Sequence, residues 1–172
     1  METGDVIDPT LIQSRENIMS YEFEILTTSP RPVLAIRVRT PVEGIPQKLG
    51  ESFGAIGHYL AEAGGQMGGA PYVAFYNMDM QDLDLEIGFP VEGEIPGRGD
   101  IQASHIPGGQ AASGIFTGPY SEMEPAYEAI AKWMAEKGLE PTGVAYEFYI
   151  DDPAEIPMEK VRTQIYFPLK AS

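Results

Sequence analysis

The sequence predicts an α+β fold built from two tandem copies of one β-α-β-β unit, with antiparallel strands and one main helix in each copy. The order strand, strand, helix, strand, strand occurs twice along the 172 residues. The last strands of the two copies also share a pattern, since Glu86–Val91 reads EIGFPV and Gln164–Leu169 reads QIYFPL. Because this match falls at the same place in both halves, an internal duplication explains it better than coincidence.

The first repeat, residues 21–91, carries strand patterns on either side of one amphipathic helix. Residues 1–20 are polar and unpatterned, and we expect an N-terminal arm there, ahead of a domain at 21–172. A turn is expected at Arg31-Pro32, and a helix at Ile45–Glu62, where apolar residues recur every three or four positions. Alternating apolar residues predict the strands Tyr21–Leu26, Val33–Arg39, Tyr72–Tyr76 and Leu83–Val91.

The second repeat, residues 101–169, follows a segment at 92–100 that is rich in Gly, Pro and Glu and is expected to be a linker. Ser121 and Glu124 fit a capping box at the start of the second helix, and Gly138 fits its C-terminal end. The predicted strands are Ile101–Ile106, Gln110–Phe116, Val144–Ile150 and Val161–Leu169.

Composition excludes several classes of function. The chain has no cysteine, which rules out disulfides and thiolate chemistry. A formal charge of −15 argues against direct binding to nucleic acid, because phosphate backbones need a basic surface. No apolar run is long enough to span a membrane, so the expected location is the cytoplasm. His58 and His105 lack metal-ligand spacing, and no cofactor motif is present, so neither a metal nor a cofactor is expected.

Strand alternation gathers aromatic and acidic side chains on the sheet face that we expect to be free of helices. Aligning Tyr76 with Tyr149 pairs Ala74 with Glu147, so this acid marks a difference between the repeats. A carboxylate walled by aromatic rings suits a lipophilic cation, although a solvated sheet face would carry the same residues. The candidate ligand-binding residues are Glu147, Tyr149, Tyr166, Tyr72, Tyr76 and Glu86.

The segments Gly143–Pro153 and Val161–Leu169 carry a family resemblance, together with Phe116–Tyr120 and Glu86–Val91. In order and spacing they resemble the GyrI-like family, whose domains also serve as effector-binding domains of AraC- and MerR-type regulators. The resemblance implies two SHS2-type units with a hydrophobic ligand pocket between the halves. It also implies that Glu147 matches the glutamate that pairs with cationic drugs, with Tyr149 and Tyr166 near it. About twenty preceding residues are too few for a helix-turn-helix module.

The leading hypothesis is a stand-alone small-molecule-binding domain for amphipathic, above all lipophilic cationic, ligands. A second hypothesis follows from the resemblance, because some free-standing members hydrolyse cyclopropane-bearing electrophiles. In that case Glu147 would be the catalytic general base. A third hypothesis is an interaction module whose acidic surface binds a basic protein partner.

Overall fold

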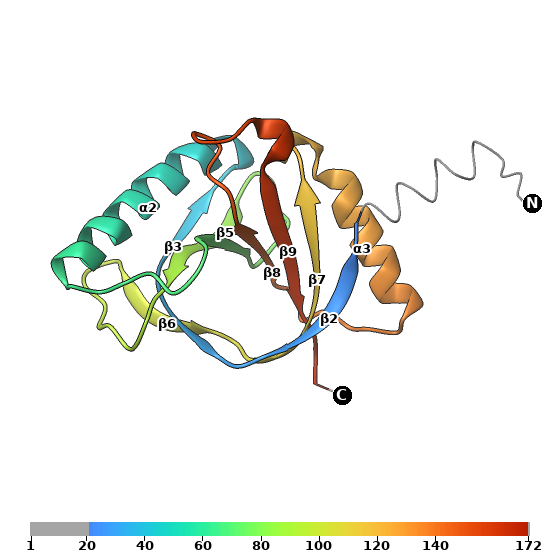
Figure 1. Cartoon of the computed structure of the whole chain (residues 1–172), viewed down its shortest axis with the longest axis horizontal. Helices are drawn as coiled ribbons and strands as arrows, with labels where there is room; N and C mark the ends of the chain where they lie inside the picture. Colours follow the sequence, from blue (N-terminus) through green and yellow to red (C-terminus); the bar gives the residue numbers. More distant parts are fainter. Residues whose placement is uncertain (1–20, 172) are drawn as a thin grey trace, which may run out of the picture.

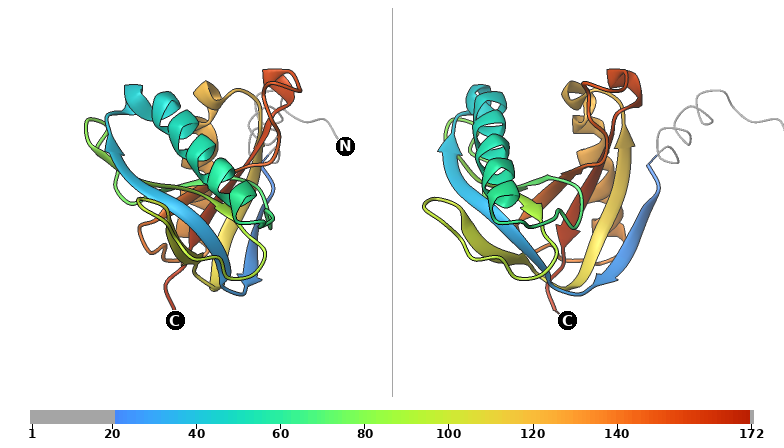
Figure 2. Two further views of the ribbon diagram at one scale, coloured as in Figure 1. Left: turned by 90° about the vertical axis from the view of Figure 1, so that its left-hand side faces the viewer. Right: turned by 60° about the vertical axis from the view of Figure 1, so that its left-hand side comes forward.

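The computed structural model describes residues 21–171, whose strands form one eight-stranded antiparallel sheet in the order β2-β7-β9-β8-β4-β5-β3-β6 (Figure 1). Figures 1 and 2 show that the sheet curls into a half-barrel with one long helix along each flank. The predicted α+β class and its duplicated halves are confirmed. The strands are β2 (Phe23–Thr28), β3 (Arg31–Thr40), β4 (Tyr72–Phe75), β5 (Leu83–Pro90), β6 (Gln102–Ile106), β7 (Gly109–Thr117), β8 (Ala145–Tyr149) and β9 (Arg162–Pro168).

Two long helices and three short 3-10 helices complete the described part of the chain. They are α2 (Ile45–Glu62), α3 (Glu124–Glu136), η1 (Val42–Gly44), η2 (Tyr120–Glu122) and η3 (Met158–Lys160). The predicted bounds of the first helix match α2. Within residues 21–171, neither long helix has the length and apolar character needed to cross a membrane. The expected arm at residues 1–20 lies outside the described residues.

The two halves share one sheet because β4 of the first half pairs with β8 of the second. Their leading strands are also exchanged. β2 pairs with β7 of the second half, whereas β6 pairs with β3 of the first half. Neither half can therefore complete its own sheet, and the halves form one folding unit.

Two local predictions are wrong. Arg31 and Pro32 begin β3 instead of forming a turn, and Pro32 lies opposite His105. A proline is tolerated there because the pairing of β3 with β5 starts only at the next residue, so no β5 acceptor needs its missing N–H. The capping box is also absent. Ser121 belongs to η2, and α3 begins at Glu124 without a side-chain cap.

Each helix covers a separate apolar core on what we call the helix side of the sheet. Under α2, Ile56 and Leu60 pack with Leu34 of β3 and Phe89 of β5. Under α3, the buried residues Ala126, Ile130 and Met134 pack with Phe116 and Ile165 of the sheet. These contacts follow from apolar residues that recur every three or four positions along each helix.

A third core fills the opposite side of the sheet, called the inner side here, which neither α2 nor α3 covers. Four aromatic residues form its centre: Tyr72 and Tyr146 lie 5.7 Å apart between ring centroids, and Phe148 and Tyr166 lie 5.5 Å apart. All four are less than 9% exposed. Because strands from both halves curl around these rings, the half-barrel buries them without help from α2 or α3.

The predicted faces of β8 are reversed. Val73 of β4 lies opposite Glu147, so Glu147 projects to the helix side, and Tyr146 and Phe148 project to the inner side. The two matching closing strands are β5 and β9. Ile87 of β5 pairs with Val73, and Ile165 of β9 pairs with Glu147. The counterpart of Glu147 is therefore Val73, and the predicted alignment with Ala74 is off by one residue. A slip of one residue moves every side chain of a strand to the other face.

The helix-side cores predict a large difference between buried and exposed isoleucines. Replacing Ile56, which has no exposed surface, by Ala should lower the free energy of unfolding by about 2–5 kcal/mol, because it leaves a cavity under α2. The same change at Ile25, which is 42% exposed, should cost roughly 0.5 kcal/mol or less. Urea denaturation measures both variants, and equal losses would contradict this packing.

Candidate ligand-binding site

Glu147 lies near the middle of the sheet, on β8 between β9 and β4, with its side chain partly buried on the helix side. Both carboxylate oxygens accept hydrogen bonds from tyrosines. Tyr149 donates its hydroxyl to Oε1 at 2.8 Å, and Tyr127 of α3 donates its hydroxyl to Oε2. The acid is thus held by its own strand and by the helix of its own repeat.

The rings around Glu147 come from both helix-side cores. Tyr149 packs with the apolar cluster of β4, β5 and α2, whereas Tyr127 packs with the cluster under α3. Tyr120 of η2 meets the Tyr149 ring edge-to-face, with 5.7 Å between centroids, and is itself 38% exposed. Glu147 therefore lies at the junction of the two halves, and a partly exposed ring stands next to its tyrosine partner.

Burial raises the pKa of Glu147, and the hydrogen bonds from Tyr127 and Tyr149 partly offset this rise. Burial, followed by the nearby Glu147 charge, raises the pKa of Tyr127 and Tyr149 well above the ordinary value. Both tyrosines therefore stay neutral hydrogen-bond donors at neutral pH. Among residues 21–171, no Lys, Arg or His nitrogen lies within 4.0 Å of the Glu147 carboxylate. Its negative charge has no cationic partner there.

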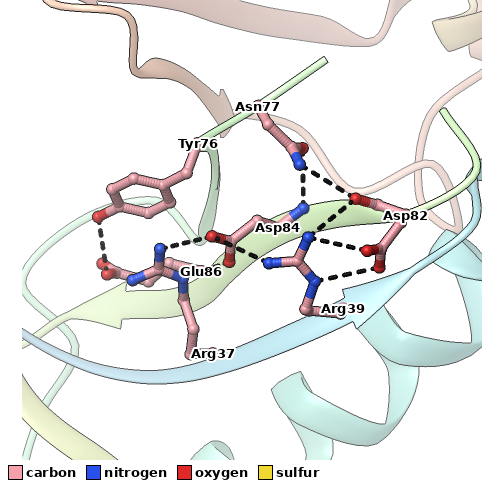
Figure 3. A network of polar contacts seen from close by, with 7 residues as sticks. All are labelled: Arg37, Arg39, Tyr76, Asn77, Asp82, Asp84 and Glu86. Carbon is pink, nitrogen blue, oxygen red and sulfur yellow. Dashed lines mark hydrogen bonds and ion pairs between the residues drawn. The ribbon is translucent and has the colours of Figure 1, made fainter. Parts of the chain in front are cut away.

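Glu86 of β5 forms a separate polar cluster on the inner side of the sheet (Figure 3). Its carboxylate accepts hydrogen bonds from the hydroxyls of Tyr72 at 2.5 Å and Tyr76 at 3.1 Å. The Arg37 guanidinium stacks over the Tyr76 ring at 3.8 Å from the centroid and pairs with Asp84. Unlike Glu147, this glutamate has an arginine beside one of its tyrosine partners, Tyr76.

Tyr166 also belongs to the inner side. Its hydroxyl shares a hydrogen bond of 3.1 Å with Thr28, and its ring packs against Tyr146 and Phe148. The candidate residues therefore divide into two groups that the sheet separates. Glu147 and Tyr149 lie on the helix side, whereas the inner side carries Tyr72, Tyr76, Tyr166 and Glu86.

Two aromatic residues next to Glu147 and Tyr149 are absent from the candidates chosen from sequence. Tyr127 fits the apolar stripe of the second helix, and that spacing predicts a core residue without indicating its hydroxyl partner. Tyr120 begins the short 3-10 helix η2 after Gly118-Pro119, where no periodicity assigns a direction to its side chain. The one sequence signal that could have identified Tyr127 is its polar hydroxyl, because it stands in an otherwise apolar stripe of the helix.

Several solved structures share this fold at low sequence identity. EcmrR in its DNA complex matches with a TM-score of 0.80 and 22% identity over 95% of this chain, which spans 62% of the EcmrR chain. A hydrolase from Listeria innocua matches with a TM-score of 0.64 and 16% identity, covering 87% of this chain and 92% of that one. SAV2435 bound to tetraphenylphosphonium matches with a TM-score of 0.57 and 11% identity, covering 87% and 94%.

No curated protein sequence matches this chain. The family model of the GyrI-like small molecule binding domain matches residues 21–170, nearly all of the described part of the chain. The family resemblance noted in the sequence is thereby confirmed. The chain belongs to the GyrI-like small molecule binding domain family.

Proposed function

We propose that this protein binds lipophilic cations at Glu147 and releases them chemically unchanged. The observation that carries the proposal is a partly buried carboxylate whose hydrogen-bond partners are the neutral hydroxyls of Tyr127 and Tyr149. The SAV2435 structure, which has a similar fold, is bound to tetraphenylphosphonium, a cation of this class.

The chemistry around Glu147 favours a large cation over a small hydrated one. Tyrosine rings attract a cation through their negative faces, and a desolvated carboxylate gains most from a cation that sheds its water cheaply. The two tyrosine hydroxyls already occupy part of the hydrogen-bond-accepting capacity of Glu147. A cation without N–H groups does not need those acceptor positions, because it interacts with the carboxylate through its charge alone. The overall charge of −15 attracts cations toward the protein.

Replacing Glu147 by Gln should weaken tetraphenylphosphonium binding at least tenfold, about 1.4 kcal/mol, because the charge is lost while the shape is kept. Isothermal titration calorimetry measures the dissociation constant. Glu86→Gln is the matched control, since Glu86 also accepts two tyrosine hydroxyls but lies on the other side of the sheet. The proposal is wrong if Glu86→Gln weakens binding and Glu147→Gln does not.

Affinity for tetraphenylphosphonium should decline in acid. The cation keeps its charge at every pH, whereas Glu147 loses its charge below a pKa that burial raises above 4.5. Binding should therefore be constant above that raised pKa and should fall roughly tenfold per pH unit below it, in the limit where only the carboxylate form binds. Calorimetry across pH tests this for the wild type. Glu147→Gln should show no such decline, and an equal decline in both would exclude Glu147 as its cause.

The raised pKa of Glu147 also favours a second candidate function, hydrolysis with Glu147 as general base on a water molecule. The fold similarity to a Listeria innocua hydrolase is consistent with it. If this candidate is right, the wild type should turn over a cyclopropane-bearing electrophile and Glu147→Gln should not. Chromatography of the products measures the turnover. An intact substrate after prolonged incubation would leave binding without chemistry.

A further inference from the structure

Thr163 of β9 has a hydroxyl with no hydrogen-bond partner. Its side chain has no exposed surface, and Oγ1 is the one buried side-chain nitrogen or oxygen atom among residues 21–171 that lacks a partner. A buried hydroxyl normally finds a partner, because leaving one unpaired forfeits the hydrogen bonds that it makes with water. The position therefore calls for an explanation.

The register of the sheet places Thr163 next to the Glu147 site. Thr163 lies directly opposite Tyr149 across the β8–β9 ladder, and Ile165, two residues further along β9, lies opposite Glu147. Side chains two residues apart on a strand share a face. Thr163 is therefore on the helix side, beside the tyrosine that donates to Glu147.

At several matched positions, the second repeat carries a polar residue where the first repeat carries an apolar one, and Thr163 is one of these residues. The closing-strand match aligns Ile87 with Ile165, and the ladders then align Val73 with Glu147, Phe75 with Tyr149 and Leu85 with Thr163. On the helices, Tyr127 and Leu49 each lie four residues after the end cap of the preceding 3-10 helix. The first-repeat residues, which form one apolar cluster, are Leu49, Val73, Phe75 and Leu85.

One repeat thus keeps an ordinary core at positions where the other carries polar groups. In the polar repeat, Glu147 accepts the hydroxyls of Tyr127 and Tyr149, and Thr163 alone is left without a partner. An apolar residue fits the same position in the first repeat, so the fold itself does not require a hydroxyl there. A partner from outside the chain would complete the set.

We propose that the Thr163 hydroxyl is a second recognition point of the Glu147 site and hydrogen-bonds a polar atom carried by the bound cation. This inference rests on the proposed function. It narrows the ligand class to lipophilic cations that also bear a hydroxyl, ether or carbonyl oxygen. Thr163 has no exposed surface, so contact with a ligand requires the side chains that cover it to move.

A matched ligand series tests the proposal. The probes are tetraphenylphosphonium and its 2-, 3- and 4-hydroxyphenyl derivatives, titrated calorimetrically into the wild-type chain and Thr163→Val. At least one hydroxylated probe should bind the wild type about threefold to tenfold more tightly than the parent cation, the gain of one net hydrogen bond. Thr163→Val should abolish that preference and leave affinity for tetraphenylphosphonium unchanged.

Thermal unfolding tests the same hydroxyl without a ligand. Thr163→Val should keep or raise Tm, by up to about 2–4 °C, because the change removes an unpaired buried oxygen and keeps the side-chain shape. Ser113→Ala is the control, since the Ser113 hydroxyl accepts a hydrogen bond of 2.8 Å from Gln164 on the inner side. That variant should lower Tm and leave the ligand preference intact.

Four results would overturn the inference. A preference for hydroxylated probes that survives Thr163→Val, or no preference in the wild type, overturns the Thr163 proposal alone, provided that tetraphenylphosphonium still binds in a Glu147-dependent way. A clear fall of Tm in Thr163→Val would show that the hydroxyl is bonded within the fold. Failure of the wild type to bind any of the phosphonium probes overturns both this inference and the proposed function.

Discussion

The pairing of β4 with β8 is the contact on which the rest of the structure depends. It joins the halves into one sheet and places Val73 opposite Glu147, where a strand of the first half lies next to a strand of the second. Backbone hydrogen bonds at this seam fix the register, and the register fixes which side chains of β8 face the helices. The inner aromatic core and the Glu147 site are therefore set together, by one ladder.

The two glutamates on opposite sides of this sheet have similar hydrogen-bond partners but different charged neighbours. Glu86 and Glu147 each accept two tyrosine hydroxyls. Glu86 also has Arg37 nearby, because the Arg37 guanidinium stacks over the Tyr76 ring while it pairs with Asp84. Glu147 has no cationic partner among the described residues, and this difference supports the proposal that it binds a cation from outside the chain.

Duplication supplies an internal reference for recognising such a site. Two copies of one backbone place Val73 and Glu147 in matching surroundings, so the difference between them cannot be attributed to the fold. The apolar copy shows what the helix side needs for packing, and the polar copy shows what has been added to it. The added groups, with the hydroxyl of Thr163 among them, surround one position in the sheet.

The sequence by itself determined the helices, the strands and the duplication, because hydrophobic periodicity depends only on neighbours along the chain. It also singled out Glu147 and Tyr149. Only the tertiary structure decided their face, since the apolar residues Tyr146 and Phe148 of β8 could satisfy either side of a sheet that is buried on both. Local alternation cannot choose between two buried faces. The choice came from pairing with β4, a strand about seventy residues earlier in the chain, together with the curl that buries the inner side.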